Sequence, residues 1–236
     1  MINNEGDKCY IEAVILAFGF EDVKDSSGKK IKKVLKVGLK NDESELGFPT
    51  YIIKKEKSIE ETLTEAVRND LNSYGNNQIL IQNFSDPDRY PEAKVIAGAY
   101  LFPVNRFEDT KYCWYSVDYE ENEGEEQIIL EKDHIKITLY YVDGLYMGMR
   151  ILNYDHAQIL YEAMKKLRDE VLHHELIFEL LPEKFTLSDL QSCYEFITRS
   201  QTTKQNFRQK FISKLKETGE FEREGAFRPS KFYKKK

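Results

Sequence analysis

Charge is divided unevenly along this chain, and the division constrains how the chain can be organised. Residues 183–236 hold 13 lysines and arginines against 7 aspartates and glutamates, a net charge of +6. Residues 1–182 hold 22 against 34, a net charge of −12. A basic end suits a polyanionic partner, whereas an acidic body does not. We therefore expect two parts with different tasks within the 236 residues.

The composition favours a cytoplasmic protein without a membrane partner. No apolar run approaches the roughly 20 residues that a membrane-spanning helix needs. The first eight residues are polar and include acids, unlike a secretory signal. Cys9, Cys113 and Cys193 are far apart, which favours free thiols over a disulfide or a metal site, and the four histidines do not complete a zinc-binding spacing. We expect no cofactor and no metal.

The first 154 residues show the alternation of strand and helix patterns that is typical of an α/β domain. A helix is predicted over residues 58–74, because Ser58 and Glu61 form a capping box and Gly75 follows where helices usually stop. A hairpin is predicted over residues 127–150, with Asp143-Gly144 as its turn. Apolar or alternating runs predict the other strands, at residues 10–20, 31–39, 79–84, 94–103 and 112–117.

The end of the chain has a helix–turn–helix pattern followed by two short strands. A long amphipathic helix over residues 155–174 precedes it. Thr186 caps the next helix, with Asp189 at the capping-box position, and Thr202 or Thr203 caps a second helix over residues 204–216. Strands at residues 220–223 and 231–234 would form a wing.

The outward face of this second helix carries side chains that can reach DNA. Glutamine and arginine hydrogen-bond base edges, and flanking cations contact phosphates. The predicted DNA contacts are Thr203, Lys204, Gln205, Asn206, Arg208, Gln209, Lys210 and Lys214 on the helix, and Arg228, Lys231, Tyr233 and Lys234 on the wing. The alternative is that these cations only solvate a small helical domain, because four nearby glutamates dilute their charge.

The first part resembles the Nudix hydrolase superfamily, but its signature is degraded. Glu60, Arg68 and Gly75 stand at the signature's spacing. The positions of the first glycine and of the three glutamates are filled by Lys54, Asn69, Asn72 and Ser73. In the superfamily those glutamates hold Mg²⁺, and asparagine and serine offer only neutral oxygens. The resemblance therefore implies no catalytic residue, no metal site and no hydrolysis by the usual mechanism.

The whole chain resembles the Nudix-related transcriptional regulators. The motifs that carry the resemblance are 84–89, 154–157, 179–187, 204–208 and 228–233. They imply an α/β plus α+β fold, a Nudix-like α/β/α sandwich with a mixed sheet followed by a small winged helix-turn-helix domain. The expected boundaries are 1–154 for the Nudix-like domain, 155–181 for the long helix and linker, and 182–236 for the winged helix, with an extra hairpin inserted at 119–151.

This resemblance implies a homodimer that binds double-stranded operator DNA and a small-molecule effector, either an ADP-ribose-type nucleotide or a sugar. The expected effector contacts are Arg89, Asp88, Glu60 and Arg68. Arg89 lies in a proline-stiffened loop and could pair an anion, or it could hold the loop by a salt bridge. Asp155-His156 is interpreted as a helix start. The alternatives are a hydrolase of nucleoside diphosphate derivatives with rearranged metal ligands, and an adaptor that binds protein or RNA.

Overall fold

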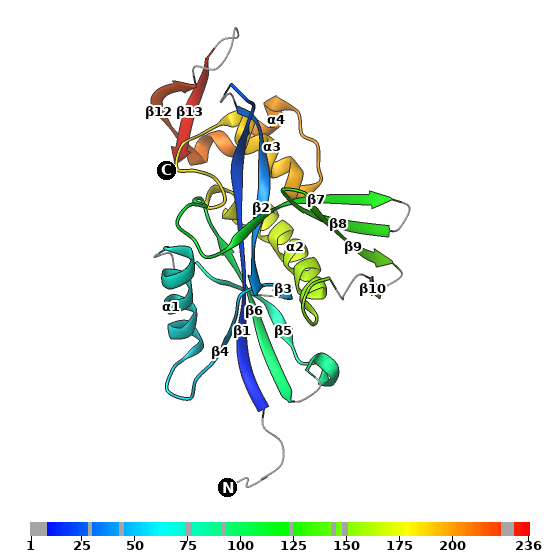
Figure 1. Cartoon of the computed structure of the whole chain (residues 1–236). Coiled ribbons are helices and arrows are strands. Elements are labelled where there is room, and N and C mark those ends of the chain that lie inside the picture. Colours follow the sequence, from blue (N-terminus) through cyan, green and yellow to red (C-terminus); the bar gives the residue numbers. More distant parts are fainter. Residues whose placement is uncertain are drawn as a thin grey trace. The chain divides into compact units, whose positions relative to one another are not determined.

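The structure is a computed structural model, and its elements are labelled in Figure 1. It describes residues 9–27, 30–42, 45–73, 77–90, 93–122, 125–142, 145–147, 151–222 and 229–236. The chain divides into two compact units. The first unit comprises residues 1–17, 37–102 and 107–164, and the second comprises residues 18–36, 103–106 and 165–236. Four elements supply residues to both units: β1 (Cys9–Lys24), β2 (Lys30–Asp42), α2 (His156–His173) and, with its last residue only, β6 (Lys94–Pro103).

A sheet of ten strands is found among the described residues. Its main path runs β10-β9-β8-β7-β2-β1-β6-β5, and β3 and β4 pair with β2 and β1 off this path. The remaining strands of this sheet are β3 (Glu45–Gly47), β4 (Thr50–Ile52), β5 (Ile79–Phe84), β7 (Cys113–Asn122), β8 (Glu125–Lys132), β9 (Ile135–Val142) and β10 (Leu145–Met147). The predicted strands at 79–84 and 94–103 are confirmed with the same bounds.

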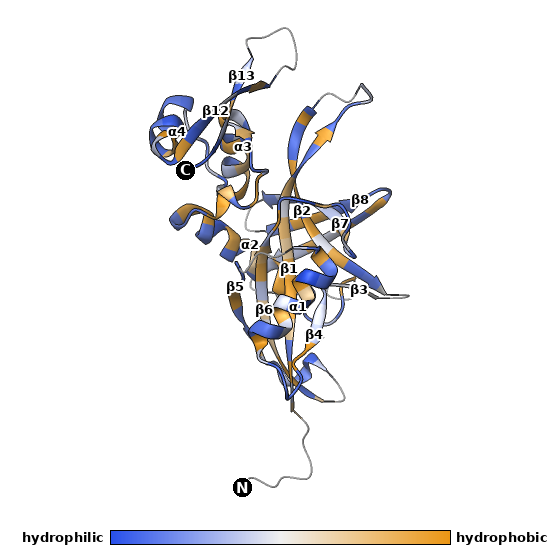
Figure 2. Cartoon of the chain, turned by 90° about the vertical axis from the view of Figure 1, so that its left-hand side faces the viewer, coloured by the Kyte–Doolittle hydropathy of each residue, from blue (hydrophilic) through white to orange (hydrophobic). Residues whose placement is uncertain are grey.

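The centre of this sheet is apolar because helices cover it. Residues 12–20 of β1 are buried without interruption, and hydrophobic colour runs along β1 and β6 in Figure 2. Figure 1 places α1 (Ile59–Leu71) and α2 on opposite sides of β1, β2 and β6. The side chains that α1 buries repeat at helical spacing, at Leu63, Ala66, Val67, Asp70 and Leu71.

The helix α1 begins as predicted and ends earlier than predicted. The capping box of Ser58 and Glu61 is formed in both directions. The last helical residue is Leu71, and Asn72 takes a left-handed conformation with φ 48°. Asparagine tolerates this conformation better than most residues, so it can end a helix without glycine. Gly75, the predicted stop, lies outside the described residues.

The region 119–151 extends the sheet and is not a single hairpin. The predicted hairpin over residues 127–150 is confirmed in part, because β9 pairs antiparallel with β10 and Val142 lies opposite Leu145, on either side of Asp143-Gly144. The prediction missed a second turn: β8 and β9 also pair antiparallel, and the chain turns between them at Asp133, whose φ is 54°. The predicted turn at Asp143-Gly144 lies outside the described residues. The sequence signal was weaker at Asp133, since no glycine follows it.

Tyrosines join this extension to the start of α2. The ring of Tyr141 in β9 stacks on Tyr161 of α2 with a centroid distance of 4.4 Å. Tyr146 in β10 packs edge-on against Tyr161, and its hydroxyl donates to Glu162 at 3.0 Å. The hydroxyl of Tyr161 donates to Glu126 of β8. These contacts cover apolar surface that an isolated strand pair would leave exposed.

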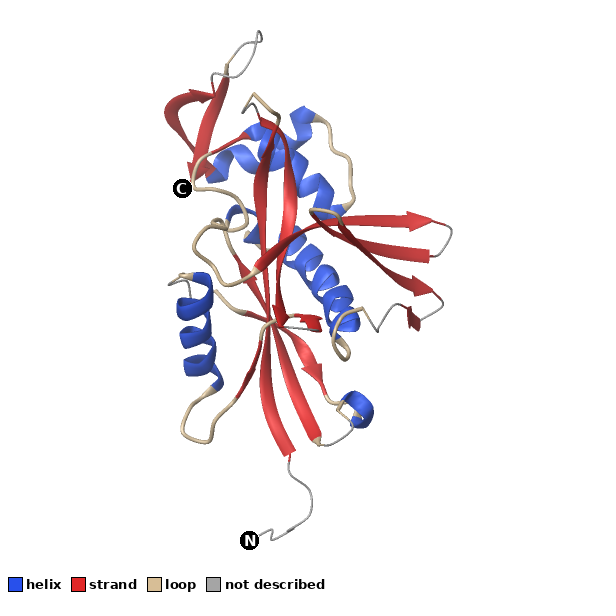
Figure 3. Ribbon diagram, viewed as in Figure 1, coloured by secondary structure: helices blue, strands red, loops and turns tan. Residues whose placement is uncertain are grey.

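The end of the chain folds as a winged helix (Figure 3). Its helices are α3 (Leu187–Thr198) and α4 (Lys204–Phe211), and its sheet has the order β11-β13-β12, from β11 (Phe185–Thr186), β12 (Leu215–Glu222) and β13 (Ser230–Lys235). The second helix was predicted to reach residue 216. It ends at Phe211, and a 3-10 turn at Ile212–Lys214 leads into β12, because Leu215 enters the core at 5% exposure as the first residue of that strand.

Candidate functional site

The two helices of the winged helix are fixed at their starts by side-chain caps. The hydroxyl of Thr186 accepts from the backbone N–H of Asp189 at 3.1 Å, and the Asp189 carboxylate accepts from the N–H of Thr186 at 3.2 Å. Arg199 ends α3 in a left-handed conformation. The hydroxyl of Thr203 then accepts from the N–H of Asn206 at 3.3 Å and caps α4. The helix–turn–helix predicted from these residues is therefore formed.

The helix α4 separates an aromatic inner face from a polar outer face. Phe207 and Phe211 are buried, with a centroid distance of 4.6 Å, and both pack against Tyr194 of α3. Most of α4 is coloured hydrophilic in Figure 2. The exposed predicted DNA contacts here include Thr203, Lys204, Gln205, Asn206, Arg208 and Gln209. This face offers the hydrogen-bonding side chains that base edges and phosphates require.

Two further predicted contacts on this side are engaged within the protein. The amino group of Lys210 donates to the Tyr194 hydroxyl at 2.6 Å and lies 4.5 Å from the centre of that ring, so Lys210 leans on α3. Lys214 pairs with Glu175 at 3.3 Å. Each cation would have to leave or share its partner to contact a phosphate.

The wing carries some of the predicted contacts but not all of them. Lys231 is exposed and pairs with Glu217 at 2.8 Å, and Lys234 is half-buried. Tyr233 was predicted to contact DNA, but the structure contradicts this prediction, because Tyr233 is only 3% exposed and packs in the core under the wing. The alternation along β13 puts Tyr233 on the inner face. Arg228 lies outside the described residues.

A cavity of about 400 Å³ lies between the start of α3, the helix α4 and the wing. Its lining includes Arg208, Lys231 and the exposed ring of Phe221, which is 50% exposed. The complete lining is Thr186, Leu187, Ser188, Arg208, Phe221, Pro229, Ser230, Lys231 and Tyr233. Phe221 was missed by the sequence reasoning, because a phenylalanine between two glutamates in a strand predicts a ring that faces the core. The cavity joins two cations and an apolar surface at one place.

In the first unit, the residues that replace the Nudix glutamates lie around the end of α1. Asn69 and Asn72 are exposed and Ser73 is half-buried. Glu60 and Arg68, two of the predicted effector contacts, are also exposed. No group of three or more histidines, cysteines, aspartates or glutamates is arranged to hold a metal ion within the part of the chain that the structure describes.

Asp70, beside these positions, holds a buried polar cluster that the sequence reasoning missed. Its carboxylate pairs with Lys40 at 2.7 Å and with Lys111 at 2.9 Å, and it accepts a hydrogen bond from Tyr51. Burial alone would raise the pKa of Asp70, but the hydrogen bonds from Lys40, Tyr51 and Lys111 lower it to about 2. The sequence carried a signal for this cluster, because the helical spacing places Asp70 on the same buried side of α1 as Ala66 and Val67.

Arg89 lies in a buried ion cluster with two carboxylates. Its side chain is fully buried, and its terminal nitrogens donate to Glu12 at 2.6 Å and to Asp155 at 2.8 Å. This is the loop-holding role that was the alternative for Arg89. Burial raises the pKa of both Glu12 and Asp155, although the charge of Arg89 opposes the rise. Asp88 is exposed on the same loop.

His156 joins this cluster and leaves polar atoms unsatisfied. Its Nδ1 accepts from the backbone N–H of Phe48 at 3.0 Å, so the neutral ring carries its hydrogen on Nε2. Burial, and secondarily the charge of Arg89, lowers the pKa of His156 to about 3. Arg89 Nε, Asp155 Oδ1 and His156 Nε2 are buried without a hydrogen-bond partner among the described residues. Such atoms indicate a place where a water or a polar ligand atom would be bound.

Comparison with known proteins agrees with this geometry. Residues 177–234 match the family model described as the NrtR DNA-binding winged helix domain. The winged helix of this chain therefore resembles the DNA-binding winged helix of NrtR. A segment of 85 residues is 32% identical to the ADPR responsive transcriptional repressor NtrR of Acinetobacter baylyi; it spans 35% of this chain and 34% of that protein, so about a third of the relative's length is matched.

Two solved structures share the fold over nearly the whole chain. A MutT/nudix family protein from Enterococcus faecalis superposes with a TM-score of 0.72 and 19% identity, covering 98% of this chain and 89% of that one. NrtR of Shewanella oneidensis, complexed with a 27mer DNA, superposes with a TM-score of 0.68 and 16% identity, covering 96% and 93%. The predicted fold, a Nudix-like mixed sheet with helices followed by a small winged helix, is confirmed. Among the described residues, no helix has the length and apolar character to cross a membrane.

Proposed function

We propose that this protein is a transcriptional repressor that binds operator DNA through its winged helix and responds to an ADP-ribose-type nucleotide in its Nudix-like unit. The observation that carries the proposal is the exposed polar face of α4 on a capped helix–turn–helix, within a winged helix that matches the NrtR DNA-binding domain. ADP-ribose is preferred over a sugar because the Acinetobacter relative is named as ADPR responsive.

The DNA-binding residues of the proposal are those that the fold leaves accessible. Lys204, Gln205 and Arg208 lie exposed near the start of α4, where a recognition helix meets base edges. Arg208 also lines the cavity beside the wing together with Lys231. A homodimer is part of the proposal because two such helices would match a palindromic operator.

The Nudix-like unit acts in this proposal as a sensor without hydrolase activity. Hydrolysis of a diphosphate by Mg²⁺ requires charged oxygen ligands, and asparagine and serine stand at the glutamate positions. Incubation of the protein with ADP-ribose and Mg²⁺ or Mn²⁺ should therefore release no AMP, as measured by chromatography. Sustained turnover would favour the hydrolase instead.

The proposal is tested by fluorescence anisotropy with DNA from the upstream region of the protein's own gene. Arg208→Ala should weaken binding about 5- to 150-fold, the loss expected for one base or phosphate contact of about 1–3 kcal/mol. Arg168→Ala, an exposed arginine on α2, is the matched control and should leave binding unchanged. Equal affinities of the two variants would contradict the role of α4.

Salt and effector measurements complete the test. Binding should weaken steeply between about 50 and 200 mM salt, because lysines and arginines that neutralise phosphates release counterions. ADP-ribose should lower the affinity of the wild-type protein for its operator, by about 5- to 150-fold for a typical coupled pair of sites. Sedimentation of the free protein should give a dimer, and a monomer at micromolar concentration would remove that part of the proposal.

A further inference from the structure

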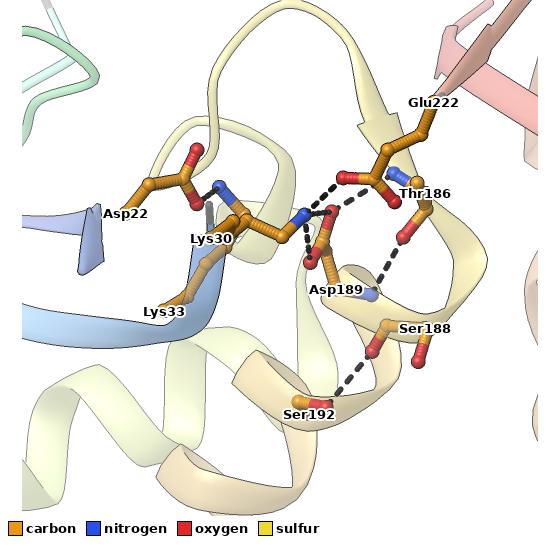
Figure 4. A network of polar contacts seen from close by, with 8 residues as sticks. All are labelled: Asp22, Lys30, Lys33, Thr186, Ser188, Asp189, Ser192 and Glu222. Atoms are coloured by element: carbon orange, nitrogen blue, oxygen red, sulfur yellow. Dashed lines mark hydrogen bonds and ion pairs between the residues drawn. The ribbon is translucent and has the colours of Figure 1, made fainter. Parts of the chain in front are cut away.

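The hairpin of β1 and β2 ends in a lysine held between two carboxylates of the winged helix (Figure 4). Lys30 is the first residue of β2. Its amino nitrogen lies 2.9 Å from Asp189 Oδ1 and 3.0 Å from Asp189 Oδ2, in the first turn of α3. The same nitrogen lies 2.5 Å from Glu222 Oε1, at the last residue of β12. One side chain therefore contacts the hairpin's two neighbours, α3 and the wing strand.

This pairing is more enclosed than the other ion pairs that involve described residues of the winged helix. The side chains of Lys30, Asp189 and Glu222 are 16%, 11% and 22% exposed. By contrast, Lys231 and Glu217 of the wing are 47% and 49% exposed. Exposed pairs contribute little, whereas a partly buried cation between two anions cannot be removed without leaving the anions to repel each other. Burial would lower the pKa of Lys30, but its two carboxylate partners raise it, so Lys30 stays charged.

Asp189 is the residue that shapes the start of α3. The same carboxylate that holds Lys30 accepts the backbone N–H of Thr186 and completes the capping box. Thr186 in turn lies opposite Phe232 in the pairing of β11 with β13. Lys30 thus acts at the point where the first turn of α3, the wing strand β12 and, through Thr186, the winged-helix sheet converge.

Apolar contacts place the same hairpin against α3. The ring of Phe20 in β1 meets Phe196 of α3 edge-on, with a centroid distance of 6.3 Å. The backbone N–H of Phe20 donates to the carbonyl of Leu180 at 2.9 Å. Lys33 pairs with Asp22 across the hairpin at 2.6 Å and stiffens it. The hairpin is therefore an ordered part of the second unit, and Lys30 is its polar attachment.

The two strands of this hairpin also hold the polar clusters of the first unit. Glu12, which pairs with Arg89, lies in β1, and Lys40, which pairs with Asp70, lies in β2. A displacement of either cluster along its strand would reach the hairpin through a continuous, hydrogen-bonded backbone. Coupling between two sites requires such an element whose position both sites can bias.

We propose that Lys30 is a positioning residue that fixes the β1–β2 hairpin to α3 and the wing. Through this contact, a displacement of β1 and β2 changes the position of the DNA-binding helices. The first half of this proposal concerns only the winged helix and its hairpin. The second half rests on the proposed function, because it requires an effector that changes DNA affinity.

The first half is tested by hydrogen–deuterium exchange on the full chain. Lys30→Met removes the charge and keeps the length, Lys30→Arg keeps the charge, and Lys32→Met removes an exposed lysine two residues away as the matched control. In Lys30→Met, amides of β12 and of the first turn of α3 should exchange about tenfold faster, because local opening becomes easier when two carboxylates lose their cation. Lys30→Arg and Lys32→Met should match the wild type.

Equal exchange in Lys30→Met and Lys32→Met would overturn the positioning role, whatever the DNA measurements show. If Lys30→Met fails to fold, Glu222→Gln tests the same contact from the wing side, and it should speed exchange in β12 while leaving Asp189 paired with Lys30. Unchanged exchange in Glu222→Gln would overturn the role in that case.

The second half is tested by the ratio of DNA affinities without and with ADP-ribose. Lys30→Met should reduce this ratio to within about twofold of unity, whereas Lys30→Arg and Lys32→Met keep the wild-type ratio. A wild-type ratio retained in Lys30→Met would refute transmission through Lys30. A wild-type protein that ignores ADP-ribose would count against the proposed effector instead, and the exchange experiment would still decide the positioning role.

Discussion

The buried cluster of Arg89, Glu12 and Asp155 gives a quantitative prediction for the stability of the first unit. Arg89→Met keeps an unbranched, flexible side chain in the place of the arginine stem and removes the guanidinium with its charge. Glu12, which is 4% exposed, and Asp155, which is 14% exposed at its side chain, would then face each other without a cation. Removing one partner of a buried ion pair costs about 3–5 kcal/mol, because the remaining charge is desolvated and unpaired. We expect this loss in the free energy of unfolding near pH 7.5.

The pH dependence of this loss has a definite sign. The pKa of Glu12 and the pKa of Asp155 are already raised by burial in the folded protein. A carboxyl with a raised folded pKa binds its proton more tightly in the folded state, so its contribution favours folding at low pH and is lost as the pH rises through the folded pKa. Without Arg89 both pKa values rise further. The difference between variant and wild type should therefore shrink as the pH falls from about 7.5 to about 5.

The single tryptophan makes this measurable for the first unit alone. Trp114 lies in that unit, half-buried, with its indole N–H donated to Thr110 at 2.9 Å and its ring against Phe107. Urea unfolding followed by tryptophan fluorescence therefore reports the unit that contains Arg89. In thermal unfolding followed by the same fluorescence, a loss of 1 kcal/mol lowers the midpoint by about 2–4 °C, so the midpoint of Arg89→Met should fall by about 6–20 °C near pH 7.5.

The matched control is Arg168→Met, which removes an exposed arginine from α2 and should change stability by less than about 0.5 kcal/mol. The reasoning is refuted if Arg89→Met costs less than about 1 kcal/mol near pH 7.5. A cost of the expected size that stays constant down to about pH 5 would show that the lost packing of Arg89, and not the unpaired carboxylates, is responsible.

Two further stability predictions follow from the caps and from Asp70. Asp70→Asn should lower the free energy of unfolding by about 2 kcal/mol at neutral pH, which is the energy of a pKa shift from 3.8 to about 2. The stability that the Asp70 carboxylate supplies is present above its ordinary pKa, and it is lost as the pH falls from 3.8 to about 2. Tryptophan fluorescence checks it, and an unchanged urea midpoint would contradict it. Thr186→Ala should lower the free energy of unfolding of the winged helix by about 1 kcal/mol, because it opens the capping box of α3. Unfolding followed by circular dichroism at 222 nm measures this loss, and the control Thr64→Ala on the surface of α1 should leave the stability of the winged helix unchanged.

The helix caps of the winged helix and the exposed face of α4 could be predicted because they depend on residues that are close in the sequence. The capping threonines Thr186 and Thr203 hydrogen-bond backbone groups only three residues away, so the sequence carries the whole interaction. The spacing of Phe207 and Phe211 in the same way determines which side of α4 faces the core and leaves Arg208 outside. Tyr233 was misplaced because a short strand of six residues alternates too briefly to show which face is buried.

The partners of the buried charges could not be predicted from local patterns. Arg89 meets Asp155 and Glu12 at separations of 66 and 77 residues, and Lys30 meets Asp189 and Glu222 at separations of 159 and 192. The Arg89 pairs depend on the sheet order, which places β6 beside β1. The Lys30 pairs depend on the packing of α3 and β12 against the hairpin of β1 and β2. A sequence pattern fixes the periodicity of an element but not its neighbours.

The amino-acid sequence by itself determined most of the strands and helices, the caps that begin α1, α3 and α4, the basic outer face of α4 and the neutral side chains at the positions of the Nudix glutamates, because each depends on residues within a few positions of one another. Only the tertiary structure decided that Arg89 is buried in an ion cluster, that Asp70 gathers two lysines and that Lys30 holds the winged helix. Burial and pairing of a charge depend on which distant strands become neighbours, and that choice is made by the packing of the whole sheet.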